Sequence, residues 1–179
     1  MEQEETSFQS AAVLLRNIHK ADYLNLINFF EELKPKLNEE CGLTFEFHHR
    51  LKSVDGIKKK LKMGKYVRDI IGIRLTNPWT HNLHLISNKI RSLLNIISTN
   101  VTERGRVIYL YGETTSGHLF EIQLWTNLIY HCFEFEHDRV YKPHHNLTEE
   151  TMKKVNYVRE EQHRLQDIID ENILVPYQF

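Results

Sequence analysis

The stretch VRDIIGIRL, residues 67–75, decides the fold. It is apolar at nearly every position and rich in Ile, which is typical of a strand buried on both faces. The Asn-Pro pair at 77–78 ends the run. One carboxylate, Asp69, lies among these apolar residues, and a buried unpaired carboxylate is costly. We therefore expect Asp69 to have a partner, either a metal ion or an arginine such as Arg74. Strict alternation puts the two on opposite faces unless Gly72 bends the strand.

Periodicity predicts the elements on either side of this strand. Apolar residues spaced by three and four predict helices at residues 11–37, 54–63, 80–98, 127–140 and 148–171. Within the first of these, Asp22 can start a second helical piece as its N-cap, and Pro35 and the Cys41–Gly42 region end the helix. Alternation predicts further strands, at residues 43–47, 106–112 and 118–125, with a turn at 113–117. This order indicates an α+β fold, in which a mixed central sheet of four to five strands is flanked by helices.

The chain divides into a flexible start at residues 1–10, one folded domain at 11–145 and a C-terminal helical extension at 146–179, with a linker at Pro143–Asn146. The last helix carries an apolar stripe, made of Val155, Val158, Leu165 and Ile169. This stripe either packs on the domain or forms a contact in a homo-oligomer, and the sequence leaves both open.

Composition excludes several classes of protein. The chain has 179 residues, 41% apolar and 26% charged, as in a globular domain. No apolar run approaches the roughly 20 residues that span a bilayer, and the acidic start does not resemble a signal peptide. We expect a cytoplasmic protein whose two cysteines are reduced. The histidine pairs at 48–49 and 144–145 are adjacent, which is not the spacing of a zinc site.

Charge is concentrated in one block. Residues 50–68 hold eight Lys and Arg against the single acidic residue Asp55, while the whole chain has a net charge of -1. A general nucleic-acid binder is usually basic overall. A local basic block therefore favours a compact anionic ligand, although a solvated helix face has the same composition.

The basic block begins in HHRLKSVDGIKKKL, residues 48–61, where a strand leads into a helix. Arg50 and Lys52 are two apart on the strand and point to one side. Ser53 can cap the helix, whose N-terminus adds a partial positive charge. Together with Lys60, these residues would hold a triphosphate.

A second carboxylate lies in FEIQLW, residues 120–125. Glu121 and Gln123 share one face of the predicted strand. If this strand neighbours that of Asp69, the two carboxylates form a Mg2+ site, because Mg2+ prefers a few carboxylates together with phosphate oxygens and water.

These segments resemble the RelA/SpoT synthetases, which transfer pyrophosphate from ATP to the 3′ hydroxyl of a guanine nucleotide to make (p)ppGpp. The family's R-x-K-S-x-x-S-I-x-x-K pattern is matched except at its second serine, where Gly56 stands. D-x-x-G-x-R is complete from Asp69 to Arg74, and E-I-Q begins at Glu121. The E-x-E-H-D-x-x-Y-K run is matched at residues 134–142. The likeness covers about residues 20–145.

The resemblance implies a nucleotidyltransferase-like fold and assigns roles to particular residues. Asp69 and Glu121 would be catalytic and bind Mg2+, and Glu121 would help to deprotonate the acceptor. The ATP-binding residues would be Arg50, Lys52, Ser53, Lys60 and Arg74. The acceptor-binding residues would be Tyr109, Gln123, His131, Tyr141 and Lys142.

The chain departs from the family on the acceptor side. The family has a Y-x-S-x-H segment whose tyrosine stacks on the acceptor guanine, and residues 102–121 contain no such trio. Trp125 replaces the arginine of E-I-Q-I-R. The sequence therefore predicts a GTP or GDP pyrophosphokinase. It leaves two alternatives open: a weak or inactive relative that binds nucleotides or a partner protein, and a synthetase-like toxin that uses an adenine nucleotide or the 3′ end of a tRNA.

Overall fold

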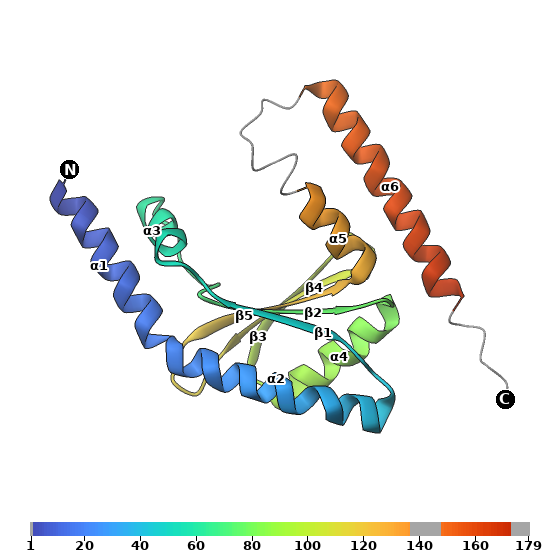
Figure 1. The fold of residues 1–179 in the computed structure, drawn as a ribbon, viewed down its shortest axis with the longest axis horizontal. Coiled ribbons are helices and arrows are strands. Elements are labelled where there is room, and N and C mark those ends of the chain that lie inside the picture. Colours follow the sequence, from blue (N-terminus) through green and yellow to red (C-terminus); the bar gives the residue numbers. More distant parts are fainter. Residues whose placement is uncertain (1, 137–147, 173–179) are drawn as a thin grey trace.

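The computed structural model describes residues 2–136 and 148–172 (Figure 1). The helices are α1 (Glu2–Ile18), α2 (Lys20–Cys41), α3 (Val54–Lys62), α4 (Thr80–Leu93), the 3-10 turn η1 (Glu103–Gly105), α5 (Asn127–Glu136) and α6 (Glu149–Glu171). The strands are β1 (Glu46–Leu51), β2 (Ile71–Asn77), β3 (Ile96–Thr102), β4 (Val107–Glu113) and β5 (Leu119–Thr126).

The five strands form one mixed sheet in the order β1-β2-β5-β4-β3. β2 and β5 are parallel, and the other three pairs are antiparallel. Helices α2 and α4 lie on one side of this sheet, and α3 and α5 lie on the other (Figure 1). The predicted α+β class, with its mixed sheet of four to five strands and its two terminal helices, is confirmed.

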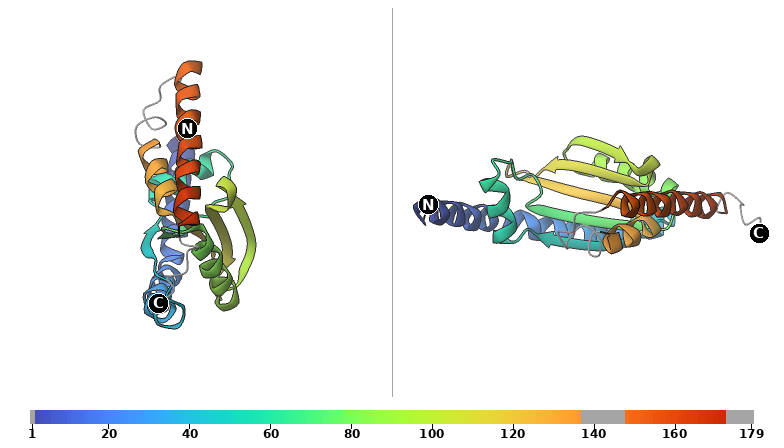
Figure 2. Two further views of the ribbon diagram at one scale, coloured as in Figure 1. Left: turned by 90° about the vertical axis from the view of Figure 1, so that its right-hand side faces the viewer. Right: turned by 90° about the horizontal axis from the view of Figure 1, so that it is seen from above.

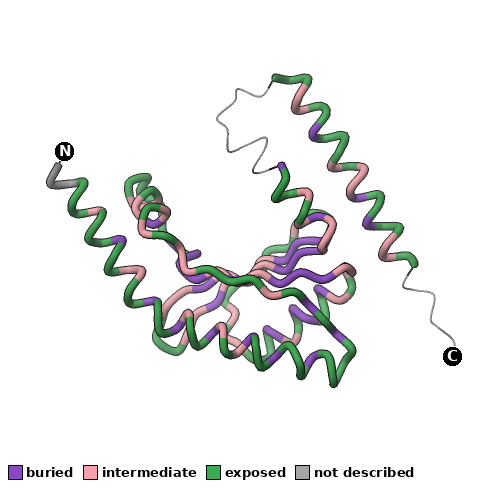
Figure 3. The backbone as a smooth tube through the Cα atoms, in the orientation of Figure 1, coloured by how far each residue is buried: buried purple, intermediate pink, exposed green. Residues whose placement is uncertain are grey.

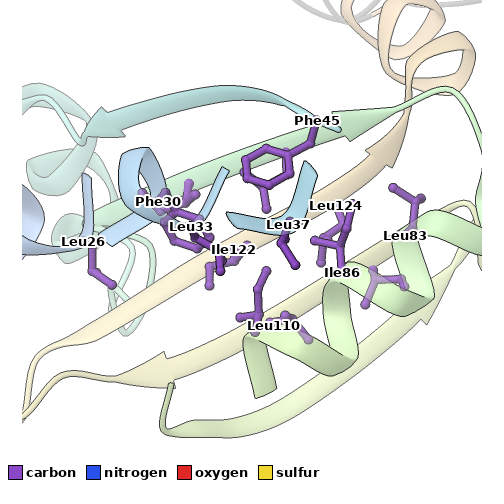
Figure 4. Close-up of a cluster of buried hydrophobic side chains, with 14 of the residues drawn as sticks. Leu26, Phe30, Leu33, Leu37, Phe45, Leu83, Ile86, Leu110, Ile122 and Leu124 are labelled. Carbon is purple, nitrogen blue, oxygen red and sulfur yellow. The ribbon is translucent and has the colours of Figure 1, made fainter. Parts of the chain in front are cut away.

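The core lies between the sheet and the pair α2 and α4 (Figure 4). Alternate residues of the central strands point into it, among them Ile73, Leu110 and Ile122, each no more than 1% exposed. Phe30 and Leu37 of α2 pack against them. Since alternate side chains point to opposite faces, the other face of the same strands is left for polar residues.

The terminal helices extend beyond opposite ends of the sheet (Figure 2) and are largely exposed (Figure 3). Helix α1 packs on α3 through Ala12 and Ile57, and Glu5 forms an ion pair of 3.0 Å with Lys58. The expected flexible segment at residues 1–10 is therefore helical from Glu2, because it has a partner in α3. None of the described helices is long and apolar enough to cross a membrane.

Three predicted elements were wrong in their bounds. The strand predicted at residues 43–47 runs instead from Glu46 to Leu51. The strand predicted at residues 67–75 begins only at Ile71, so that Asp69 precedes it. The helix predicted at residues 80–98 ends at Leu93, and the missed strand β3 begins at Ile96. The apolar spacing of three and four runs across this break, but the β-branched residues after it form a ladder with β4.

Helix α2 also differs from its prediction. Pro35 lies inside the helix on its exposed side, where the carbonyl it leaves unpaired can bond water, and the helix ends at Gly42 in the left-handed conformation. The N-cap position is His19, and Asp22 lies in the first turn.

Helix α6 is confirmed, but its predicted stripe is not the buried face. Val155 is buried, whereas Val158 and Leu165 are 48% and 45% exposed. The buried positions are instead the polar His163 and Gln166. The predicted end of the preceding helix, to residue 140, and the predicted linker at 143–146 lie outside the described residues.

Asp22 fixes the β4–β5 turn to α2. Its carboxylate accepts hydrogen bonds from the Thr114 and Ser116 hydroxyls at 2.7 and 3.2 Å, and His118 Nδ1 lies 2.7 Å from Oδ2. Burial raises the pKa of Asp22, but these three partners outweigh it, and the pKa lies below its ordinary value.

We expect Asp22→Asn to destabilise the protein by about 1–3 kcal/mol at pH 7, as for other buried groups that lose their partners. Because the folded pKa is below the unfolded one, the wild type's advantage is fully present above about pH 4 and is lost as the pH falls through the folded value. Urea unfolding from pH 7 to pH 3 measures it, with the exposed Glu39→Gln as control. The prediction is contradicted if the difference in unfolding free energy between the wild type and Asp22→Asn does not shrink at low pH.

Candidate active site

Residues of four strands form two rows across the polar face of the sheet. The strand register gives the first row as Arg50, Gly72, Glu121 and Tyr111, and the second as His48, Arg74, Gln123 and Tyr109. Neighbouring rows are two residues apart along each strand, so both face the same side. The polar face therefore brings together residues from β1, β2, β5 and β4.

A cleft of about 510 Å3 lies over these rows. Its lining residues come from β1, β2, β4, β5 and α5: His48, His49, Arg50, Gly72, Ile73, Arg74, Tyr109, Glu121, Gln123, Trp125, Phe133 and Glu134. The cleft thus lies on the side of the sheet where Figure 1 shows α3 and α5.

The cationic end of the cleft is organised around Asp69. Lys52 and Lys60 each donate a hydrogen bond of 2.7 Å to it, one to each carboxylate oxygen, and the guanidinium of Arg50 lies 3.6 Å away. Asp69 is only 8% exposed. Burial raises its pKa, but the hydrogen bonds from the two lysines outweigh this, and the pKa lies below its ordinary value. Asp69 is therefore ionised at neutral pH.

Ser53 connects this cluster to α3. Its hydroxyl accepts a hydrogen bond of 3.1 Å from the Gly56 backbone N–H, as the predicted cap requires. The helix start is thereby fixed next to Lys52, and Lys60 reaches the cluster from the last turn of α3. Arg50, Lys52 and Lys60 therefore converge on one carboxylate, that of Asp69.

Arg74 does not pair with Asp69. It donates to Gln123 Oε1 and Glu134 Oε1, both at 3.1 Å, and its guanidinium lies 4.8 Å from the centre of the Tyr130 ring. Asp69 and Arg74 therefore have different partners at different ends of the cleft, and Gly72 is not required to bend the strand.

Glu121 is held from two sides. Gln123 donates a hydrogen bond of 2.5 Å to its Oε1, and the Tyr111 hydroxyl contacts it from the opposite strand. Burial and the charge of Glu121 raise the pKa of Tyr111, with a smaller contribution from Asp69. Tyr111 therefore lies opposite Glu121 in the sheet. It was absent from the predicted site, although the 113–117 turn places it opposite Glu121.

Only some of the predicted acceptor-binding residues line the cleft. Tyr109 and Gln123 line the cleft. His131 is exposed on α5, contacts the Tyr130 ring and is not among the cleft residues. Tyr141 and Lys142 lie outside the described residues. Trp125 and Phe133, which the prediction did not include, line the cleft near Tyr109.

The two carboxylates fit a magnesium ion by the chemistry of their donors. The described residues contain no cluster of three or more His, Cys, Asp and Glu that could hold a metal alone. Asp69 and Glu121 offer oxygen ligands only, and each carboxylate oxygen that accepts one hydrogen bond keeps a second lone pair. Mg2+ characteristically takes one or two carboxylates and completes its shell with phosphate oxygens and water.

No protein-family model matches the chain, and no curated protein sequence is similar to it. Several solved structures share its fold. The small alarmone synthetase 1 from Bacillus subtilis, bound to its product pppGpp, has a TM-score of 0.70 at 18% identity, covering 86% of this chain and 91% of that chain. The small alarmone synthetase 2 from Bacillus subtilis has a TM-score of 0.68 at 18% identity, with 86% and 93% covered.

A GTP pyrophosphokinase family protein from Streptococcus pneumoniae is also similar, with a TM-score of 0.62 at 18% identity, covering 84% of this chain and 87% of that chain. At this identity the likeness establishes a shared fold. The chain therefore has the fold of the small alarmone synthetases, as its resemblance to RelA/SpoT synthetases implied.

Proposed function

We propose that the protein transfers pyrophosphate from ATP to the 3′ hydroxyl of a guanine nucleotide in the cytoplasm, with Mg2+ between Asp69 and Glu121. The observation that carries this proposal is the convergence of Arg50, Lys52 and Lys60 on one buried carboxylate beside a cleft that also contains Glu121. Two structures of the same fold have nucleotide ligands, one pppGpp and the other AMPCPP.

The cation cluster has more positive charge than its own carboxylate can offset. Asp69 offsets one of the three charges, and the positive end of α3 adds to the surplus. A polyphosphate supplies the missing negative charge, and its oxygens can accept from Lys52, Lys60 and the fork of Arg50. The cluster therefore favours the triphosphate of ATP over a neutral ligand.

The transfer forms a bond between the acceptor's 3′ oxygen and the β-phosphorus of ATP. The bond from that phosphorus to the oxygen bridging it to the α-phosphorus breaks, and AMP leaves with that oxygen. The proton of the 3′ hydroxyl passes to the carboxylate of Glu121, which Gln123 and Tyr111 hold in place. Lys52 and Lys60 stabilise the charge on the phosphates. A bound Mg2+, held by Asp69 and Glu121, would neutralise part of that charge.

The test uses purified protein with ATP labelled in its β-phosphate, Mg2+ and one acceptor at a time: GTP, GDP, ATP or tRNA. We expect AMP release and label transfer that depend on GTP or GDP. Transfer to ATP or tRNA instead would identify a different acceptor class. Binding of ATP with no transfer to any acceptor would contradict the proposal and indicate a nucleotide-binding relative without activity.

Gly72 leaves room for Arg50 in the floor of the cleft. A Cβ at this position would lie 3.2 Å from both Cγ and Nε of Arg50. We expect Gly72→Ala to displace this flexible side chain, weaken ATP binding about fivefold and change stability by less than about 1 kcal/mol. Calorimetric titration with a non-hydrolysable ATP analogue measures the affinity. Unchanged affinity would show that Arg50 does not hold ATP from this position.

A further inference from the structure

The end of the cleft opposite the cation cluster is aromatic. Tyr109, Trp125 and Phe133 line it, with ring centres 6.3 Å apart for Tyr109 and Trp125 and 4.9 Å apart for Trp125 and Phe133. Trp125 is 3% exposed and Phe133 is 39% exposed. The buried indole therefore packs against a phenyl ring that is partly exposed, and aromatic rings favour stacking on planar groups.

The same three aromatic residues line a second hollow of about 120 Å3, which continues the cleft towards α6. Its remaining walls include Glu103 of η1, Glu136 of α5, and Arg159 and Gln162 of α6. The helix outside the predicted synthetase domain thus forms one wall of a hollow that adjoins the site.

Ion pairs and hydrogen bonds hold α6 at this wall. Arg159 donates to Glu136 at 2.8 and 3.0 Å, and Arg104 donates to Glu160 at 2.7 Å. The buried Arg106 pairs with Asp167 and contacts His163. Gln162 lies between these contacts along the helix, so its position relative to the aromatic residues is well defined.

Gln162 is available for a ligand. It is half-buried, and within the described ranges its amide has no hydrogen-bond partner. Glu103, across the hollow, accepts from His163 Nε2 at 3.1 Å through Oε2 and has a further oxygen. An amide that donates and a carboxylate that accepts match the edge of guanine, which has an acceptor oxygen next to two N–H donor groups.

We infer that α6 completes the acceptor site, in which the guanine base lies against Phe133 and Tyr109 and Gln162 reads its edge. This inference rests on the proposed function and identifies a specificity-determining residue for it. ATP occupies the cationic end, the acceptor base occupies the aromatic end, and Glu121 lies between them on the cleft floor. The α6 wall replaces contacts that the missing Y-x-S-x-H segment would otherwise supply.

The test compares Gln162→Leu with Asn156→Leu, which makes the matched change on an exposed face of α6. Calorimetric titrations measure the affinity of each protein for GDP and, separately, for a non-hydrolysable ATP analogue. We expect Gln162→Leu to bind GDP about tenfold more weakly, the effect of one lost hydrogen bond to a base. Its affinity for the ATP analogue, its helicity and its melting temperature stay within error of the control.

In steady-state assays, the KM for the guanine nucleotide rises by a similar factor and the KM for ATP does not. Equal GDP affinity in Gln162→Leu and the wild type overturns the inference, as does a wild type that binds no GDP. A wild type that binds both nucleotides but transfers no pyrophosphate contradicts the proposed function alone, because a GDP affinity that depends on Gln162 still supports the α6 wall.

Discussion

We expect Glu121→Gln and Asp69→Asn each to lower the proposed pyrophosphate transfer by about a thousandfold or more while the protein stays folded. Glutamine at 121 keeps the shape of the side chain but cannot take the acceptor's proton, and a positioned base contributes roughly 10²–10⁴ in rate. Asparagine at 69 removes the charge shared by Lys52 and Lys60 and a ligand of the proposed Mg2+. Each tenfold loss corresponds to about 1.4 kcal/mol of transition-state stabilisation.

Transfer of the label from the β-phosphate of ATP to the acceptor measures the loss, and a thermal melt of each variant checks the fold. The control is Asp55→Asn, which neutralises an exposed carboxylate on α3 and should keep turnover within about twofold of the wild type. Two results contradict the assignment. Turnover that survives either change means that the carboxylate takes no part in the reaction, and unfolding of a variant means that its carboxylate is structural.

Three cleft residues, Arg50 on β1 and Glu121 and Gln123 on β5, could be predicted because alternation along a strand is a local property. Glu121 and Gln123 share a face, as expected, and Arg50 lies in the same row as Glu121. Ser53 was predictable as a cap for the same reason. The hydrogen bonds that Lys52 and Lys60 both donate to Asp69 could not be predicted. Lys60 reaches Asp69 only because of the way α3 and the segment before β2 fold.

Two regions were missed because tertiary contacts decide them. β3 follows α4 without a change in apolar spacing, and its ladder with β4 gives it the strand conformation. The docking face of α6, which the sequence left open, is formed by charged and polar residues rather than by the apolar stripe. Arg106 is buried against His163 and Asp167, whereas Leu165 is left exposed. Apolar periodicity does not report an interface of this kind.

We expect Gly112→Ala to destabilise the protein by about 3 kcal/mol, the upper part of the range for overpacked sites. A Cβ on Gly112 would lie 2.2 Å from Cζ of Phe120 and 2.8 Å from the carbonyl oxygen of Asn95. Phe120 is 1% exposed and belongs to the core, so its ring has little room to move. The Asn95 carbonyl also accepts from the Glu113 N–H at 3.0 Å, which fixes it as well.

Urea unfolding of Gly112→Ala measures the loss, with Gly72→Ala as a matched control from the same sheet. At Gly72 the closest atoms belong to the flexible Arg50 side chain, so the control should lose less than about 1 kcal/mol. Adding Phe120→Leu to Gly112→Ala removes the ring atoms that the new methyl group meets. The double variant should therefore lose less stability than the two single changes together. If the stability losses of the two single changes add up in the double variant, the clash lies with the Asn95 carbonyl oxygen instead.

The same overpacking should reach the candidate active site, because Gly112 and Phe120 are sequence neighbours of Tyr111 and Glu121. Gly112 follows Tyr111, and Phe120 precedes Glu121, on strands that pair at this point. If the ring and the methyl group push β4 and β5 apart, Tyr111 moves away from its register partner Glu121 before the protein unfolds. Gly112→Ala should then lose transfer activity at temperatures where it is still folded, and the Phe120→Leu change should restore part of it. Activity that falls only in step with unfolding would confine the effect to stability.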